Sequence, residues 1–129
     1  MRRRDAVNAI QALYGVGGQV ARALQISEIR TVAADSLWMS PQHARDTASL
    51  HFTWRREPEA VGRVLVGLEA ALAPFEARPH WGKLFAADAA AIARLYPRLP
   101  DFRRLAGRLD PRGAFRNAWL ARHVLGSEG

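Results

Sequence analysis

The segment RPHWGKLFAAD, residues 78–88, contains the only lysine of the chain, Lys83. Lysine and arginine together number 19, so the other 18 basic side chains of these two types are arginines (19 − 1 = 18). A lysine ammonium is a compact charge whose pKa shifts readily on burial, whereas a guanidinium stays protonated. Lys83 is therefore a candidate for chemistry that arginine cannot perform. A codon preference for arginine would also leave one lysine by chance.

Two segments have the composition and alternation of β-strands, residues 27–33 (SEIRTVA) and residues 48–54 (ASLHFTW). Side chains alternate across a strand, so each segment has an apolar face suited to helix packing and a polar face for water, a partner or a ligand. The side chains on the polar faces are Glu28, Arg30, His51 and Thr53.

Residues 79–85 are short and aromatic, and we predict a third strand there that ends in the HWGK motif. This strand would bring a lysine to the polar surface of the first two. The side chains that converge in this hypothesis are Glu28, Arg30, Thr53 and Lys83. The alternative is that Glu28 and Arg30 form a surface ion pair worth about 0–1 kcal/mol, and that Thr53 and His51 are ordinary strand residues.

Helical periodicity predicts the elements that hold these strands. Apolar residues from Val7 to Leu24 indicate a first helix, weakened or bent by GVGG at 15–18. Glu57-Pro58-Glu59 opens the most regular helix, residues 35–46 form a loop, and short helices punctuated by prolines follow Ala87. The order predicts an α+β fold with a small antiparallel sheet covered on one face by helices. Three strands make a thin sheet, and a segment outside this chain could complete it.

The 129 residues are enough for one domain, residues 1–129, with a real core. The net charge of +7 favours nucleic-acid binding as an alternative function. The arginines are scattered from Arg2 to Arg122, however, and no nucleic-acid-binding motif accompanies them, so we expect no nucleic-acid partner. A third possibility is a non-catalytic orphan domain.

Several other kinds of site lack support in the sequence. Cysteine is absent, and the four histidines lack HExxH or comparable spacing, so we expect no metal site. GVGG does not match the dinucleotide fingerprint, and no phosphate-binding loop is present. No apolar run approaches the roughly 18–20 residues that span a bilayer. The basic residues 2–4 precede an amphipathic stretch without a clear cleavage site, so we predict no targeting segment.

Five segments of the chain together resemble the C-terminal part of the D-arabinono-1,4-lactone oxidase family, closest to its bacterial alditol (xylitol) oxidases. They are EIRTVAADSLWMSP, LHFTW, RPHWGKLF, LYPRLPDFRRL and DPRGAFRNAWL. The resemblance runs from about residue 5 to residue 125. It implies an FAD-linked enzyme of the vanillyl-alcohol-oxidase type, in which a substrate or cap domain lies over the flavin. The flavin domain has no counterpart here, so this chain resembles a C-terminal fragment that is inactive alone.

The resemblance also implies roles for particular residues. Glu28, Arg30, Thr53 and Lys83 correspond to the polyol-binding residues of the family, with Lys83 and Arg30 as catalytic candidates that hydrogen-bond the reacting hydroxyl. Desolvation beside Trp81 and the flavin would favour a neutral Lys83 amine that acts as a base. His80 corresponds to a motif histidine near the flavin.

The chemistry implied by the resemblance is oxidation of a carbinol by hydride transfer to FAD, with O₂ then reduced to hydrogen peroxide. The substrate is a polyol or a sugar lactone, and the several hydroxyls of an acyclic polyol modestly favour an alditol. FAD would be bound mainly by a domain that is absent here, which a separate flavin-domain chain could supply. The resemblance implies a cytoplasmic location, with membrane association in some members.

Overall fold

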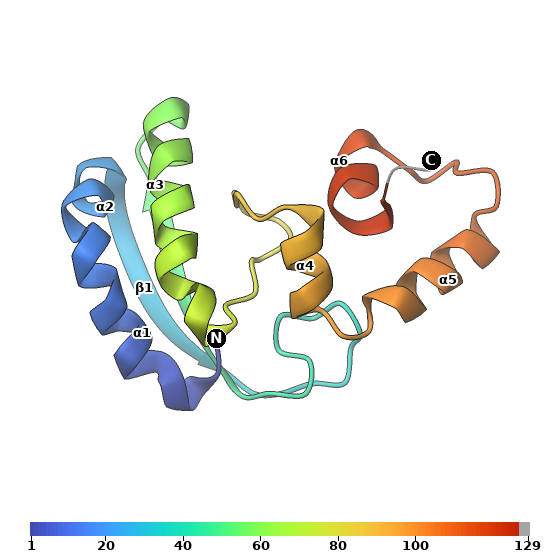
Figure 1. Cartoon of the computed structure of the whole chain (residues 1–129), viewed down its shortest axis with the longest axis horizontal. Helices are drawn as coiled ribbons and strands as arrows, with labels where there is room; N and C mark the ends of the chain where they lie inside the picture. The colour runs from blue at the N-terminus through green and yellow to red at the C-terminus, as the bar shows by residue number, and fades with distance from the viewer. Residues whose placement is uncertain (127–129) are drawn as a thin grey trace.

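The computed structural model describes residues 1–126, and its first half packs helices on a sheet (Figure 1). Two short helices, α1 (Ala6–Ala12) and α2 (Gly17–Ala23), stand where the sequence predicts one bent helix. The 3₁₀ turn η2 (Leu13–Val16) separates them, beside glycines that weaken a helix. A further 3₁₀ turn, η1 (Arg3–Asp5), precedes α1.

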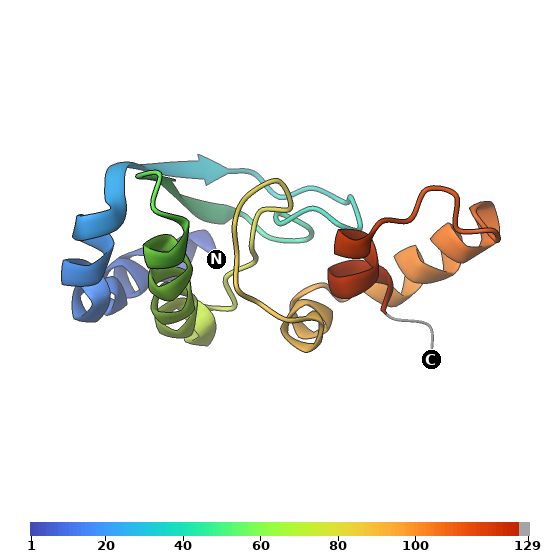
Figure 2. The ribbon, with the colours of Figure 1, turned by 90° about the horizontal axis from the view of Figure 1, so that it is seen from above.

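The sheet consists of β1 (Leu24–Val32) and β2 (Thr47–Trp54), which pair antiparallel and lie within three residues of the predicted boundaries. Helix α3 (Pro58–Leu72) follows β2 and begins with proline, whose fixed φ suits the first helical position. Helices α1, α2 and α3 lie on one side of the sheet (Figure 2). The buried core between them includes Ala9, Val20, Ala23, Ala48, Val61, Val64, Leu65, Leu68 and Leu72. The fold is therefore α+β, as the sequence predicts.

A second, smaller core lies in the C-terminal half and joins short helical segments. These are α4 (Ala89–Leu95), α5 (Leu99–Leu109), α6 (Ala118–Leu120) and the π-helical turn η4 (Ala121–Leu125). The 3₁₀ turn η3 (Ala73–Phe75) ends the first half. The buried side chains of the second core are Ile92, Tyr96, Leu99 and Val124. Pro100 lies in the first turn of α5, where a missing N–H costs no intrahelical bond.

The prediction of a third strand at residues 79–85 is wrong, because these residues form a turn followed by an irregular segment. The N–H of Lys83 donates a hydrogen bond to the carbonyl of His80 at 3.0 Å, which closes the turn. Trp81 and Phe85 pack against the second core instead of joining the sheet. Their spacing therefore reflects the anchoring of a turn, and the sheet within residues 1–126 has two strands.

Candidate functional site

Strand β1 presents its charged side chains on the face of the sheet that the helices leave open. A β-bulge at the start of the strand sets this orientation. Leu24 pairs with Trp54, but the next paired residue along β1 is Ile26, so the strand contains one extra residue. One extra residue reverses the alternation of side chains beyond it. Glu28 consequently lies opposite His51, on the open face.

Glu28 is the central charge of that open face. Its Oε2 accepts a hydrogen bond from Nη2 of Arg30 at 2.5 Å and lies 3.5 Å from Nδ1 of His51. The side chains of Glu28 and Arg30 are 44% and 64% exposed. An ion pair this open contributes little to stability. The carboxylate and the guanidinium are thus accessible to a ligand that carries hydroxyl groups.

Thr53 lies on the same face of the sheet, opposite Ile26 and two residues beyond His51. Its side chain is exposed. Two residues of a strand span about 6.6 Å, at about 3.3 Å per residue. A chain of several hydroxyl-bearing carbons can bridge this span, so one acyclic polyol can contact the Thr53 hydroxyl and the charged pair together.

The HWGK turn, residues 80–83, carries two polar side chains on the surface and outside any strand. The side chains of His80 and Lys83 are exposed. Nδ1 of His80 accepts a hydrogen bond from the N–H of Gly82 at 3.0 Å, which leaves Nε2 as the protonated nitrogen of the neutral ring. Within the described residues, no hydrogen bond or ion pair engages the Lys83 ammonium.

Trp81 anchors this turn to the second core. Its indole N–H donates a hydrogen bond to the carbonyl of Met39 at 2.6 Å. The centroid of its ring lies 4.7 Å from that of Tyr96 and 5.9 Å from that of Trp119. Aromatic pairs at such distances contribute about 0.5–1.5 kcal/mol beyond the area that they bury. The turn is therefore held in place while its polar side chains remain open to solvent.

The motif DPRGAFRN, residues 110–117, supports the turn indirectly. The carboxylate of Asp110 accepts hydrogen bonds from two backbone N–H groups of the following loop, at 2.7 and 2.9 Å. Gly113 has a φ of +68°, a left-handed conformation that favours glycine. The side chain of Asn117 caps α6, which carries Trp119. The motif thus fixes a helix whose tryptophan packs against the HWGK turn.

Two charged side chains tie the segment around the turn to the rest of the molecule. Arg78 donates hydrogen bonds to three backbone carbonyls, on α4 and on the loop between β1 and β2, at 2.8–3.2 Å. Burial lowers the pKa of Arg78. Glu69 of α3 accepts a hydrogen bond from the N–H of Ala86 at 2.6 Å, and burial raises the pKa of its carboxyl. The sequence pattern did not reveal these contacts, because the partners are 17–37 residues apart.

The structure brings together part of the predicted site. Glu28, Arg30 and Thr53 share the open face of the sheet, where His51 joins them as a neighbour of Glu28. Strand alternation placed His51 on this face but did not identify its contact. Lys83 belongs to a separate turn, and no hydrogen bond or ion pair joins its side chain to the strand residues in the described part of the chain.

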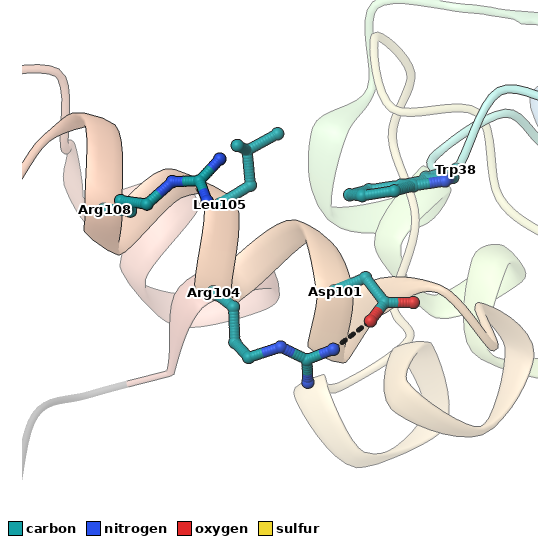
Figure 3. Close-up of a pocket in the computed structure, with 5 residues that line it drawn as sticks. All are labelled: Trp38, Asp101, Arg104, Leu105 and Arg108. Carbon is teal, nitrogen blue, oxygen red and sulfur yellow. Dashed lines mark hydrogen bonds and ion pairs between the residues drawn. The ribbon is translucent and has the colours of Figure 1, made fainter.

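An open groove of about 380 Å³ lies elsewhere, between Trp38 and one side of α5 (Figure 3). Asp101 is ion-paired with Arg104, as Figure 3 shows, and with Arg98, whose guanidinium stacks 4.7 Å from the centroid of the Trp38 ring. The lining residues are Trp38, Asp101, Arg104, Leu105 and Arg108. The groove contains none of the predicted site residues, and its carboxylate is already engaged by two arginines.

Part of the positive charge of the chain has a structural role. Arg45 is buried and donates a hydrogen bond to the carbonyl of Glu76 at 2.9 Å, and burial lowers its pKa to about 10. Within residues 1–126, no cluster of three histidine or acidic side chains has the geometry to hold a metal ion. In the same residues, no helix combines the length and the apolar character needed to span a bilayer.

Comparison with known proteins shows the family of this chain. The family model for D-arabinono-1,4-lactone oxidase matches residues 4–123, nearly the whole length. The chain belongs to the D-arabinono-1,4-lactone oxidase family. The match confirms the resemblance that the sequence motifs indicated, and it covers both the open strand face and the HWGK turn.

Three relatives illustrate the range of activities named among similar proteins. An alditol oxidase of Streptomyces sp. strain IKD472 / FERM P-14339 is 51% identical over 118 residues, which are 92% of this chain and 28% of that protein. A long-chain alcohol oxidase of an uncultured marine euryarchaeote is 32% identical over 92% of this chain and 26% of its own length. An L-gulono-1,4-lactone dehydrogenase of Mycobacterium tuberculosis strain H37Rv is 34% identical over 77% of this chain and 23% of its own length. The chain thus spans about a quarter of the length of these oxidoreductases.

Proposed function

We propose that this chain is the substrate-binding portion of an FAD-dependent oxidase that oxidises a carbinol of an alditol. An aldonolactone is the second candidate substrate. The observation that carries the proposal is the 51% identity to an alditol oxidase over 92% of the chain. Residues 1–129 then form the C-terminal part of a substrate or cap domain. The chain alone is inactive, and a flavin-binding domain on the same or a separate polypeptide completes it.

The open strand face supports an alditol as the substrate. Glu28 accepts hydrogen bonds from substrate hydroxyl groups, and Arg30, which it pairs with, donates to their oxygens. Thr53 can both donate and accept, and it holds a further hydroxyl along the strand. An acyclic polyol offers this row of groups more hydroxyls than a lactone ring does, which favours the alditol.

Lys83 is the residue that we assign to the reacting carbinol, together with Arg30. Its exposed ammonium has no partner within the described residues, so it is available to hydrogen-bond the reacting oxygen and to stabilise negative charge that develops there. In its neutral form the amine can instead accept the hydroxyl proton, which a guanidinium cannot do. Lys83 and the open face of the sheet act on the same substrate only if the flavin-binding domain holds that substrate in contact with both.

The residues of this chain can contact the ring of a flavin, but they do not form a complete FAD-binding site. The turn offers Nε2–H of His80 and the Lys83 ammonium as donors for the oxygens and nitrogens of the ring. Within residues 1–126, no glycine-rich loop of the phosphate-binding kind opens a helix, so the phosphates of FAD need another domain. When bound, FAD supplies the electron acceptance that amino-acid side chains lack.

The proposal is tested by spectroscopy and a peroxide assay on the purified chain. The chain is measured alone, with added FAD, and with FAD plus the part of the Streptomyces alditol oxidase that it does not match. We expect no flavin absorbance on the chain alone, and xylitol-dependent peroxide only from the mixture. A mixture with no peroxide from xylitol or from an aldonolactone would contradict the proposal. Lys83→Arg separates the two roles of the lysine, because retention of most turnover would rule out a base.

A further inference from the structure

A small pocket lined by arginines lies beside the first residues of β2. Its volume is about 240 Å³, and its lining residues are Arg2, Arg3, Arg4, Arg45 and Asp46. The pocket forms where the segment before α1 meets the segment before β2. Arg2 forms a β-bridge with Thr47, and the N–H of Arg3 donates to the carbonyl of Asp46 at 2.9 Å. Backbone contacts therefore hold four guanidinium groups around one cavity that includes none of the residues proposed to bind the alditol.

Arg45 is the most buried of these side chains. It is only 4% exposed, and its Nε is buried without a hydrogen-bond partner among the described residues. Nη2 donates to the carbonyl of Glu76 at 2.9 Å, but Nη1 lies 3.8 Å from the carboxylate of Glu76, which is too far for a hydrogen bond. A buried donor without an acceptor is costly, so such groups in native proteins usually have a partner. The unpaired Nε of Arg45 therefore points to a ligand that supplies an acceptor.

The other guanidinium groups of the pocket also keep unused donors. Arg2, Arg3 and Arg4 lie 3.5–3.9 Å from the carboxylates with which they pair, beyond the usual hydrogen-bond distance. Each guanidinium has five N–H donors, so most of these donors remain available. Together with Arg45, the four guanidinium groups pair with only three carboxylates, those of Asp5, Asp46 and Glu76. The cluster therefore carries excess positive charge.

Two pKa shifts are consistent with this positive surplus. Burial, together with the charges of Arg78 and Arg2, lowers the pKa of Arg45 to about 10. Burial, together with the charges of Arg45 and Arg78, lowers the pKa of the Met1 amino group to about 6. A bound anion would offset the repulsion among these cations and stabilise their charged forms.

We propose that this pocket binds a phosphate group through hydrogen bonds from Arg45 and from the arginines of residues 2–4. The inference is independent of the proposed function, since the pocket shares no residue with the open face or the HWGK turn. Guanidinium forks match phosphate oxygens in geometry and charge. The tetrahedral oxygens of phosphate also serve donors that come from two segments better than the two coplanar oxygens of a carboxylate do. The bound group joins the segment before α1 to the segment before β2.

Isothermal titration calorimetry of the purified, untagged chain with inorganic phosphate tests the site. At constant ionic strength, we expect saturable binding of one phosphate per chain with a Kd below about 1 mM, and much weaker binding of acetate. Phosphate should also raise the unfolding midpoint more than sodium chloride of equal ionic strength, because it binds only the folded state. Heat that does not saturate, or equal binding of acetate and phosphate, would overturn the inference.

Matched variants separate a specific site from attraction to the net charge. Arg3→Gln should weaken phosphate binding by about tenfold, whereas Arg63→Gln, at an exposed position of α3 without an ion pair in the described residues, should leave it nearly unchanged. Equal weakening by the two variants would overturn the inference. Arg45→Lys keeps the buried charge but replaces Nε with a methylene, so it should weaken binding by about tenfold or more. Wild-type affinity in Arg45→Lys would also overturn it. Arg3 is exposed, so its result holds even where Arg45→Lys lowers stability.

Two further ligands identify the source of the phosphate group. Glycerol 3-phosphate carries it on a soluble ester, and vesicles of phosphatidylcholine and phosphatidic acid carry it on a lipid surface. Tighter binding of glycerol 3-phosphate than of inorganic phosphate would support a soluble ester as the ligand. Retention on the vesicles that is lost in Arg3→Gln and kept in Arg63→Gln would support a lipid headgroup. Failure of all three phosphate ligands to bind would overturn the inference.

Discussion

Glu28 on β1 and Lys83 on the HWGK turn are both exposed, but the elements that carry them are held differently. The neighbours of Glu28 along β1 are also exposed, and its contacts are a surface ion pair and a histidine. Two residues before Lys83 in the turn is Trp81, which hydrogen-bonds to the backbone of Met39 and packs against the aromatic rings of Tyr96 and Trp119.

The proposed site therefore joins a strand whose side chains are mostly exposed to a turn that is anchored by a buried-side aromatic contact and a hydrogen bond. Substitutions on the open face should therefore change binding and spare stability. Substitutions that anchor the turn should unfold the protein.

Trp81→Ala should have the largest effect on stability. It removes a large aromatic side chain from contact with Tyr96 and Trp119, together with a hydrogen bond to the backbone. We expect the free energy of unfolding to fall by about 3–5 kcal/mol, measured by urea denaturation. Lys83→Ala, two residues along the same turn, is the control and should change it by less than about 0.5 kcal/mol. Equal losses from the two variants would contradict the anchoring role of Trp81.

Arg78→Met should have the next largest effect. The substitution keeps the length of the side chain but leaves three backbone carbonyls without their donor. Loss of hydrogen bonds from a charged donor in a half-buried site is costly, so we expect the free energy of unfolding to fall by about 2–3 kcal/mol. Arg63→Met, at an exposed position of α3, is the matched control and should be nearly neutral. A neutral Arg78→Met would show that the two halves of the chain do not depend on this link.

Glu69→Gln should show a pH-dependent effect. Burial raises the pKa of Glu69, so the folded state binds its proton more readily than the unfolded chain. The stability that the wild-type protein gains from a protonated Glu69 is fully present below the pKa of Glu69 in the unfolded chain. It is lost as the pH rises through the higher pKa of Glu69 in the folded state. The variant cannot titrate but keeps an acceptor for the N–H of Ala86. The unfolding free energy of the variant minus that of the wild type should therefore increase as the pH rises from about 4 to about 7. Parallel pH profiles would contradict the burial of this carboxyl.

Arg30→Gln should have the smallest effect. Its ion pair with Glu28 is exposed, so the free energy of unfolding should change by less than about 0.5 kcal/mol. Arg45→Gln is the contrasting variant, because the Arg45 side chain is buried and hydrogen-bonded to a backbone carbonyl. It should lower the free energy of unfolding more than Arg30→Gln does. Thermal denaturation of both variants measures the difference. A larger loss from Arg30→Gln would mean that the open face also stabilises the fold.

The sequence predicted the helices and the two strands because their periodicity is local. β-Branched and alternating residues marked β1 and β2, and Pro58 with regularly spaced apolar residues marked α3. The prediction of a third strand was wrong because Trp81 and Phe85 pack against the second core, which is built from distant segments. Local spacing cannot distinguish such anchoring from a strand. Proline position was a similar local signal, since Pro100 lies in the first turn of α5.

Three of the four residues of the candidate site could likewise be placed together from the sequence. Glu28, Arg30 and Thr53 were placed on one surface by alternation within each strand, although the bulge and the register that align the two strands depend on their pairing. The position of Lys83 could not be predicted from the sequence. It depends on Trp81 and on the long-range bonds of Arg78, which join segments more than thirty residues apart.

The central claim is that the open face around Glu28 binds the polyol while contributing little to the fold. The most direct measurement is the KM for xylitol of Glu28→Gln, in the mixture with FAD and the unmatched part of the Streptomyces alditol oxidase. Loss of a hydrogen-bonding charge should raise the KM roughly tenfold or more, with unfolding unchanged. An unchanged KM, or an absence of turnover in the wild-type mixture, would contradict the claim.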